Sequence, residues 1–361
     1  MASVLLRAYG WDDHWRARYD DFLVSAAASE IEDPEVGRVV RHDGAGLMVA
    51  TADGPPRRAM FGPSVVPAPV VGDWVVLDRH DTPRATLPRD SLLRRRAAGG
   101  EGEQALVANL DVVLIVCGLD RPVRLGRIQR TVTLANDAGA DSVVVLTKAD
   151  RAAAEAVTAA RATVAEVDPS LPVLLVSATS GAGIDDLATH VGDRTVALIG
   201  ESGAGKSTLV NRLVAEEVAE EGAVRAGDSK GRHTTTSREL HLLAGGGVLV
   251  DTPGIREVGV FAEQEAVAET FPDIDELVLQ CRFNDCAHLS EPGCAVSAAV
   301  ADGDLDEGRL ARWRALRAEV EAAEARSDPA AGRRRAQQRS RTPREGSRRD
   351  QLRSELDRDE M

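Results

Sequence analysis

The chain is poor in aromatic residues and has no long apolar run. Aromatic residues make up 3% of its 361 residues. The only aromatic residues between positions 35 and 100 are Phe61 and Trp74, and Trp74 is expected in a core. Side chains that could stack on nucleic-acid bases are therefore scarce in this segment, and we expect it to make no base-specific contacts. No stretch approaches the roughly 18 apolar residues of a membrane helix, and Met1–Arg7 is too short for a signal peptide. We therefore expect a cytoplasmic protein without a membrane partner.

The formal net charge of −14 argues against a general nucleic-acid binder, but arginine is concentrated in two segments. Between residues 35 and 100 there are ten arginines against seven acidic residues, and this basic segment could contact a phosphate backbone. Between residues 333 and 349 there are eight arginines against Glu345 alone. Two interpretations of the second run stay open: a solvated, disordered tail, or a contact with RNA.

The stretch Gly200–Ser207 fits the GxxxxGK[ST] pattern of a phosphate-binding loop. An apolar run at 195–199 predicts a buried strand before it, and a helix is predicted at 208–213. Such a turn surrounds an anion with backbone N–H groups and the positive end of a helix dipole. A triphosphate is the natural ligand, with Lys206 on its β- and γ-phosphates and the Ser207 hydroxyl on Mg²⁺. The residues expected to bind nucleotide here are Gly200, Glu201, Ser202, Gly203, Ala204, Gly205, Lys206, Ser207 and Thr208.

A second apolar run, 248–251, ends in the sequence Asp251-Thr-Pro-Gly254. Asp251 is placed to hold Mg²⁺, and Gly254 can give its N–H to the γ-phosphate and so detect its presence. At a predicted strand end beyond a phosphate loop, this pattern favours a nucleotide switch over a simple turn. Lys206, Asp251 and Gly254 are therefore expected in the catalytic site.

Base recognition is expected at Thr147–Asp150. The Asp150 carboxylate can accept hydrogens from N1 and the 2-amino group of guanine, a donor pair that adenine lacks. The stem of Lys148 can lie on the ring, and Ser177 with Ala178 can supply an N–H to guanine O6. GTP is therefore favoured over ATP. Taken alone, the Lys-Asp pair has a second interpretation, as a cap on the helix that follows.

The base-recognition segments precede the phosphate loop, whereas in an ordinary GTPase they follow it. This order predicts a circularly permuted GTPase that binds GTP and Mg²⁺ and releases GDP and phosphate. Thr147 stands where the ordinary pattern has asparagine. Threonine keeps one hydroxyl but lacks the two-sided amide, so we expect a weaker tie to the phosphate loop and lower nucleotide affinity.

Three of the four cysteines lie near a histidine, in the set Cys281, Cys286, His288 and Cys294. Three thiolates and one imidazole complete a tetrahedron with no open position, which favours a structural zinc site over a catalytic one. Disulfides fit less well, because an odd number of thiols would leave one over and His288 without a role. Cys117 lies alone in an apolar run and is expected to be a small buried hydrophobe.

These motifs resemble those of the ribosome small subunit-dependent GTPase A family (RsgA, also called YjeQ), which is circularly permuted in this way. Gly231–Thr236, Asp251–Glu257 and the spacing of Cys281–Cys294 match the family pattern, and the match runs from about residue 35 to about residue 325. The resemblance implies a multidomain α/β fold with an N-terminal OB-fold β-barrel, a circularly permuted P-loop GTPase domain and a C-terminal zinc-binding helical domain. It also implies the small ribosomal subunit, both its RNA and its proteins, as the partner late in maturation. We expect a monomer.

Composition changes along the chain predict five segments, although length alone predicts two or three domains. Short alternating runs separated by Gly and Pro are typical of a small barrel. Aromatic residues at helical spacing between 11 and 23 predict an amphipathic helix. The segments are 1–34, an N-terminal helical extension; 35–100, the barrel; 101–260, the GTPase domain; 261–330, the zinc-binding helical domain; and 331–361, the arginine-rich tail.

Slow intrinsic hydrolysis is expected, because Ile255 stands where many GTPases have a glutamine that orients water. The resemblance implies acceleration by the small subunit. His233 is either a water-positioning substitute, as the resemblance suggests, or an ordinary loop histidine. Among Thr234–Thr236 we favour Thr235 for contact with Mg²⁺ and the γ-phosphate, so the expected Mg²⁺ ligands are Ser207, Thr235 and Asp251. The alternatives are a permuted GTPase with another RNA or protein target, a non-enzymatic zinc and RNA adaptor, and an ATP-hydrolysing relative.

Overall fold

The computed structural model describes residues 4–42, 46–63, 65–96, 103–214, 238–251, 264–283, 286–289 and 291–327. The chain forms two compact units: the first contains Met1–Arg96 and Glu103–Thr270, and the second includes the residues from Phe271 onward. The finer division into five segments stays a prediction. No helix among the described residues is both long and apolar enough to cross a membrane.

A sheet of 11 strands is the frame of the first unit. Its strands are β1 (Glu35–His42), β2 (Gly46–Ala50), β3 (Arg57–Met60), β4 (Trp74–Leu77), β5 (Pro83–Thr86), β8 (Val112–Gly118), β9 (Asp141–Thr147), β10 (Val173–Leu175), β11 (Thr195–Gly200), β12 (Arg238–Leu242) and β13 (Val248–Asp251). Their order is β10-β9-β8-β11-β13-β12-β1-β2-β3, with β4 paired to β1 and β5 to β4. β6 (Leu92–Arg96) and β7 (Glu103–Ala108) form a separate antiparallel pair.

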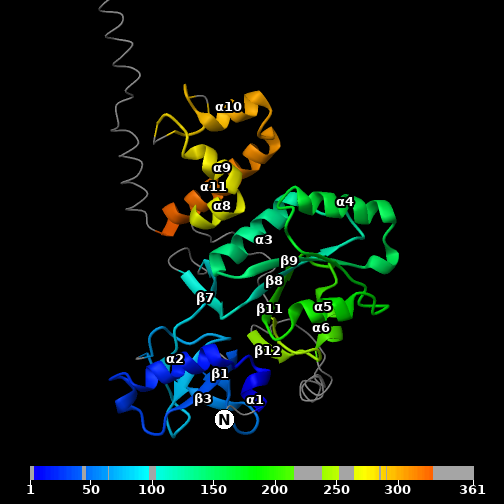
Figure 1. Cartoon of the computed structure of the whole chain (residues 1–361). Coiled ribbons are helices and arrows are strands. Elements are labelled where there is room, and N and C mark those ends of the chain that lie inside the picture. The colour runs from blue at the N-terminus through cyan, green and yellow to red at the C-terminus, as the bar shows by residue number, and fades with distance from the viewer. Residues whose placement is uncertain are drawn as a thin grey trace, which may run out of the picture. The chain divides into compact units, whose positions relative to one another are not determined.

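The parallel strands β10, β9, β8, β11 and β13 have helices on both faces (Figure 1). Successive residues of a strand point to opposite faces, so Val113 and Ile115 pack with Ile128 on one side, while Leu114 packs with Leu209 on the other. The helices of the first face are α3 (Leu125–Ala138) and α4 (Ala154–Ala165), and those of the second are α5 (Ile184–Val191) and α6 (Lys206–Leu213). α8 (Gln264–Thr270) packs on α3, where Thr133 and Thr270 share a buried hydrogen bond of 2.9 Å.

The strand order explains how scrambled segments can meet. β11, which leads into the phosphate loop, lies between β8 and β13, and β9 lies next to β8. The carboxyl ends of parallel strands share one edge of a sheet, where ligands of open α/β sheets bind. The carboxyl ends of β9, β11 and β13 therefore lie at the same edge.

The N-terminal β region, β1 to β5, is antiparallel and covered by two short helices, α1 (Val4–Ala8) and α2 (Asp13–Leu23). α2 begins at a cap in which the Asp12 carboxylate accepts the Trp15 N–H at 3.0 Å. The rings of Trp11 and Trp15 lie 4.9 and 5.8 Å from that of Trp74, which is fully buried. The predicted amphipathic helix and the core position of Trp74 are thus confirmed.

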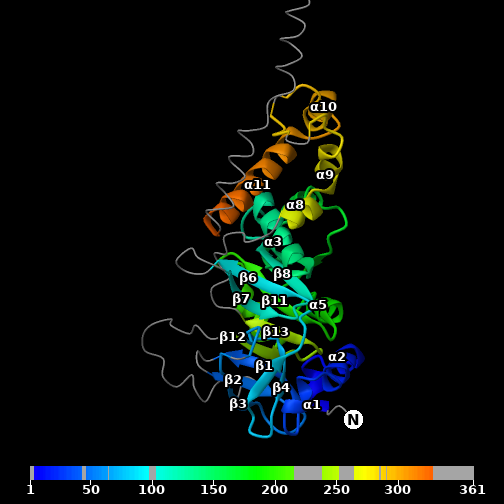
Figure 2. The same ribbon diagram turned by 90° about the vertical axis from the view of Figure 1, so that its left-hand side faces the viewer.

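The N-terminal β region continues the sheet that contains the parallel strands, because β1 pairs with β12 through Arg41 and Glu239 (Figure 2). Arg38 of β1 is only 2% exposed and its guanidinium joins segments far apart in sequence. It donates to Tyr9 O, to Gly72 O at 3.3 Å, to Asn109 O at 3.3 Å and to Thr195 Oγ1 at 2.9 Å. Burial lowers the pKa of Arg38 to about 10, so this buried group stays charged at neutral pH.

Several arginines of the basic segment are engaged within the protein. An ion pair with an internal carboxylate reduces the positive charge available to a phosphate backbone. Arg38 is buried, and five others lie within 3.2 Å of a carboxylate. These pairs are Arg57–Glu35 at 2.6 Å, Arg79–Glu32, Arg84–Asp78 and Arg89–Asp73 at 2.7 Å, and Arg94–Asp137 at 3.2 Å.

The described part of the second unit is helical, with α9 (Pro272–Val278), α10 (Ala295–Asp302) and α11 (Glu307–Ser327). α9 and α11 are linked by Arg309 and Asp273, whose side chains lie 2.6 Å apart. On α11, Leu310 and Trp313 are buried. The multidomain α/β fold expected from the sequence is confirmed, with an N-terminal β region, a parallel sheet covered by helices and a C-terminal group of three cysteines and one histidine.

Candidate functional site

The phosphate loop has the predicted strand and helix on its two sides. β11 ends at Gly200 and α6 begins at Lys206. The glycines are needed here: Gly205 has a φ of 94°, and a Cβ on Gly200 would lie 2.3 Å from the carbonyl oxygen of Val116 on β8. The Lys206 ammonium donates to the carbonyls of Gly200 and Glu201 at 2.5 and 2.7 Å. These two hydrogen bonds hold the Lys206 ammonium against the backbone of the phosphate loop, where a phosphate can bind.

Hydrogen bonds join the base segment to the phosphate loop. Thr147 ends β9, is buried, and donates its hydroxyl to the carbonyl of Ala204 at 2.5 Å. Lys148 has a φ of 61° and donates from Nζ to the carbonyl of Gly203 at 2.6 Å. Thr147 therefore reaches the loop with its one hydroxyl, in the position where the sequence predicted a weakened tie.

Asp150 is held by the segment after β10. Its Oδ1 accepts the Ser177 hydroxyl at 2.6 Å, and this hydrogen bond is the largest cause that lowers the pKa of the Asp150 carboxyl. Ser177 is buried and its Oγ also accepts the N–H of Ser180 at 3.1 Å. The carboxylate is thus oriented and kept ionised, the form that can accept two guanine hydrogens. Ala178 follows Ser177 in the same turn.

Several predicted residues lie beyond what the structure describes. Gly254, His233 and Thr235 lie outside the described residues, as do Ile255 and the arginine-rich tail. Asp251 is the last residue of β13 and pairs with Glu239 of β12. Its backbone therefore stands at the strand edge where the phosphate loop opens.

The loop after β8 and the first turn of α3 add charged residues that the sequence patterns did not single out. Asp120 accepts the Lys148 ammonium at 2.8 Å. Arg121 and Arg127 contact the Glu201 carboxylate of the phosphate loop at 3.7 and 2.8 Å. These residues belong to no sequence motif, because the two members of each pair lie 28 to 80 residues apart in the chain.

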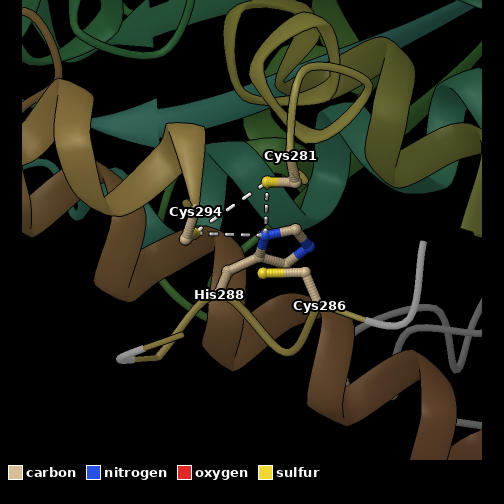
Figure 3. Close-up of side chains that lie close together, drawn as sticks. All are labelled: Cys281, Cys286, His288 and Cys294. Atoms are coloured by element: carbon tan, nitrogen blue, oxygen red, sulfur yellow. Dashed lines mark hydrogen bonds between the residues drawn. The ribbon is translucent and has the colours of Figure 1, made fainter. Parts of the chain in front are cut away.

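The predicted zinc ligands meet in the second unit, where the four side chains point toward one another (Figure 3). Cys281 Sγ lies 3.5 Å from His288 Nδ1 and 3.9 Å from Cys294 Sγ, and Cys294 Sγ lies 3.8 Å from the same nitrogen. All four ligand atoms, including that of Cys286, lie within 4.8 Å of one another. Zinc bonds of about 2.3 Å to sulfur and 2.0 Å to nitrogen require about 3.8 Å between sulfurs and about 3.5 Å between sulfur and nitrogen. The donor set and the spacing both fit a tetrahedral metal site.

The surroundings favour metal binding by this group. Burial lowers the pKa of His288, which keeps the imidazole neutral and able to ligate. Burial also raises the pKa of Cys286 to about 12, so a nearby cation is needed to hold that sulfur as thiolate. Trp313 packs edge-on against His288 at 5.5 Å, and Arg314 donates to its carbonyl.

Sequence comparison now identifies the family. A family model described as RsgA GTPase matches residues 86–261. The small ribosomal subunit biogenesis GTPase RsgA of Streptomyces coelicolor is 44% identical over 332 residues, which cover 90% of this chain and 88% of that protein. The chain belongs to the RsgA GTPase family. The RsgA protein of Syntrophotalea carbinolica is 36% identical over 362 residues, 95% of this chain and 97% of its own length.

Solved structures agree with this membership in the RsgA family. YjeQ from Thermotoga maritima matches with a TM-score of 0.60 and 25% identity, covering 80% of this chain and 98% of that one. YloQ, described as a circularly permuted GTPase, matches with a TM-score of 0.57 and 23% identity over 81% of this chain and 97% of its own, and shows the same fold. The predicted permutation is confirmed, and the chain is a GTP hydrolase of the RsgA family.

Proposed function

We propose that the protein binds GTP and Mg²⁺ where the base and phosphate segments meet, and hydrolyses GTP to GDP and phosphate in the service of the small ribosomal subunit. The observation that carries this proposal is the pair of hydrogen bonds from Thr147 to Ala204 and from Lys148 to Gly203. They support one site for one nucleotide, with its base toward Asp150 and its phosphates at the loop.

Each residue has a distinct task in this site. The Asp150 carboxylate, fixed by Ser177, accepts from N1 and the 2-amino group of guanine. Lys148 lies along the base, and Ala178 supplies an N–H to O6. The loop N–H groups and Lys206 bind the β- and γ-phosphates, which is electrostatic stabilisation by groups already in place before the reaction.

The Mg²⁺ ligands in this proposal are Ser207, Asp251 and Thr235. Bound Mg²⁺ neutralises charge on the β- and γ-phosphates. Gly254 contacts the γ-phosphate through its N–H and so distinguishes GTP from GDP. His233 has two open roles, water positioning or none, and a His233→Ala variant with unaltered subunit-stimulated turnover would remove it from the mechanism.

The small ribosomal subunit is the proposed partner because the matched relatives are named for its biogenesis. We infer that its binding, through RNA and ribosomal proteins, accelerates a turnover that is slow in the isolated protein, late in subunit maturation. The test is phosphate release by purified protein alone, with small subunits and with large subunits. Stimulation by small subunits alone supports the proposal. Equal rates in all three samples would favour the rival, a permuted GTPase with another RNA or protein target.

The second unit is proposed to hold one structural Zn²⁺ on Cys281, Cys286, His288 and Cys294. All four donors are used in the tetrahedron, which leaves no position for a substrate. Elemental analysis of the purified protein should find one zinc per chain, and a Cys286→Ser variant should retain much less. We also propose that the protein is a cytoplasmic monomer. Light scattering of the purified protein measures its mass and so tests the monomeric state.

A further inference from the structure

Five charged side chains of alternating sign lie in a row beside the phosphate loop: Lys148, Asp120, Arg121, Glu201 and Arg127. Lys148 Nζ is 2.8 Å from Asp120 Oδ2, and Arg121 Nη2 is 3.4 Å from the same oxygen. Arg121 Nη1 then lies 3.7 Å from Glu201 Oε2, and Arg127 Nη2 lies 2.8 Å from Glu201 Oε1. Each arginine thus contacts a different oxygen of the Glu201 carboxylate.

Glu201 brings a negative charge into a loop that must bind a triphosphate. Its own carbonyl accepts the Lys206 ammonium at 2.7 Å, so its backbone is part of the phosphate cradle. A carboxylate at this place repels the phosphates unless positive charges compensate it. Arg121 and Arg127 are placed to supply that compensation.

The row of charges also contacts the phosphate loop at its other end, through Lys148. Lys148 donates to the Gly203 carbonyl at 2.6 Å, and a Cβ on Gly203 would lie 3.3 Å from Arg121 Nη2. Arg121 therefore lies against the backbone of the loop. This arrangement adds a second connection between the base segment and the loop, beside the single hydroxyl of Thr147.

The geometry points to Arg121 and Arg127 as positioning residues of the nucleotide site, which neutralise Glu201 and fix the phosphate loop to the segment that follows β8. This inference rests on the proposed binding of guanine nucleotide and adds to the site the loop after β8, with Arg121, and the first turn of α3, with Arg127. The side chains of Arg127 and Glu201 are 42% and 23% exposed. Solvent and salt screen charges at such positions, so the effect on affinity is moderate and depends on ionic strength.

The test is calorimetric titration of GDP, with Mg²⁺ present, into Arg127→Met, Glu201→Gln and the double variant. We expect Arg127→Met to weaken GDP binding about tenfold at low salt, and less at high salt. The double variant should bind within about twofold of wild type, since no carboxylate is left to repel phosphate. Arg161→Met, on the exposed side of α4, is a matched loss of charge and should bind like wild type.

The outcomes separate the two proposals. A wild type that binds GDP, with Arg127→Met binding equally well, overturns the inference alone. So does a double variant as weak as Arg127→Met, because arginine would then act only on local structure. A wild type that binds no guanine nucleotide overturns the proposed function and this inference together. If Arg127→Met does not fold, Arg127→Gln, alone and combined with Glu201→Gln, provides the same comparison, because glutamine also removes the charge; rescue by Glu201→Gln is expected, and absence of rescue contradicts the inference.

Discussion

Replacing Arg38 with methionine should destabilise the first unit strongly. Methionine keeps the apolar stem and much of the volume but removes the guanidinium, which donates to Tyr9, Gly72, Asn109 and Thr195. A hydrogen bond from a charged group contributes about 1.5–3 kcal/mol. Four such bonds are lost and the cost of burying the guanidinium is relieved, so we expect the free energy of unfolding to fall by about 3–5 kcal/mol. That is a large part of the roughly 5–15 kcal/mol that stabilises a typical domain. At about 2–4 °C per kcal/mol for a unit of this size, the melting temperature should fall by roughly 10 °C.

Tryptophan fluorescence is an intrinsic probe for measuring this loss of stability. The guanidinium carbon of Arg38 lies 5.2 Å from the ring centre of Trp74, so tryptophan fluorescence during thermal unfolding reports on the junction of β1 with the GTPase sheet. Arg38→Lys, which keeps a charge but has fewer donors, should lie between methionine and wild type. A midpoint for Arg38→Met equal to that of wild type would refute the view that this arginine holds the N-terminal β region to the GTPase sheet.

Three further predictions concern the nucleotide and zinc sites. Ser177→Ala removes the hydrogen bond that lowers the pKa of Asp150. The carboxylate that guanine needs is lost as pH falls through its pKa, so the variant should lose GDP binding at a higher pH than wild type; superimposed acid limbs in a pH titration would contradict this. Thr147→Val removes the hydroxyl that contacts Ala204 and should weaken GDP binding about tenfold, whereas Thr147→Ser should not; equal affinities would show that this contact is unimportant. Chelation of zinc should remove on the order of 10 kcal/mol from the second unit, so its helices should become protease-sensitive, and unchanged proteolysis and circular dichroism of the metal-free protein would contradict a structural metal.

Local patterns predicted the elements of the site well. The apolar runs at 195–199 and 248–251 are strands, and the phosphate loop lies between a strand and a helix as its glycines require. The zinc ligands also meet as predicted, because three cysteines and a histidine within a short segment can reach one another whatever the rest of the fold does.

Long-range pairing was not predictable from such patterns. Arg38 was one of ten arginines in a basic segment, and nothing nearby in sequence shows that it is buried against Thr195, 157 residues away. Arg127 and Glu201 are likewise brought together by the order of β8 and β11 in the sheet. Hydrophobic periodicity specifies strands and helices, whereas the partner of a charged side chain depends on which strands become neighbours.

The central claim is that segments scrambled along the chain meet around one guanine nucleotide, with the Asp150 carboxylate accepting from the base. Equilibrium binding of GDP and xanthosine diphosphate to wild type and to Asp150→Asn tests it most directly. The account predicts that the variant loses affinity for GDP and gains it for xanthosine diphosphate, whose 2-oxo group can accept from the new amide. An unchanged preference for GDP in Asp150→Asn would contradict it.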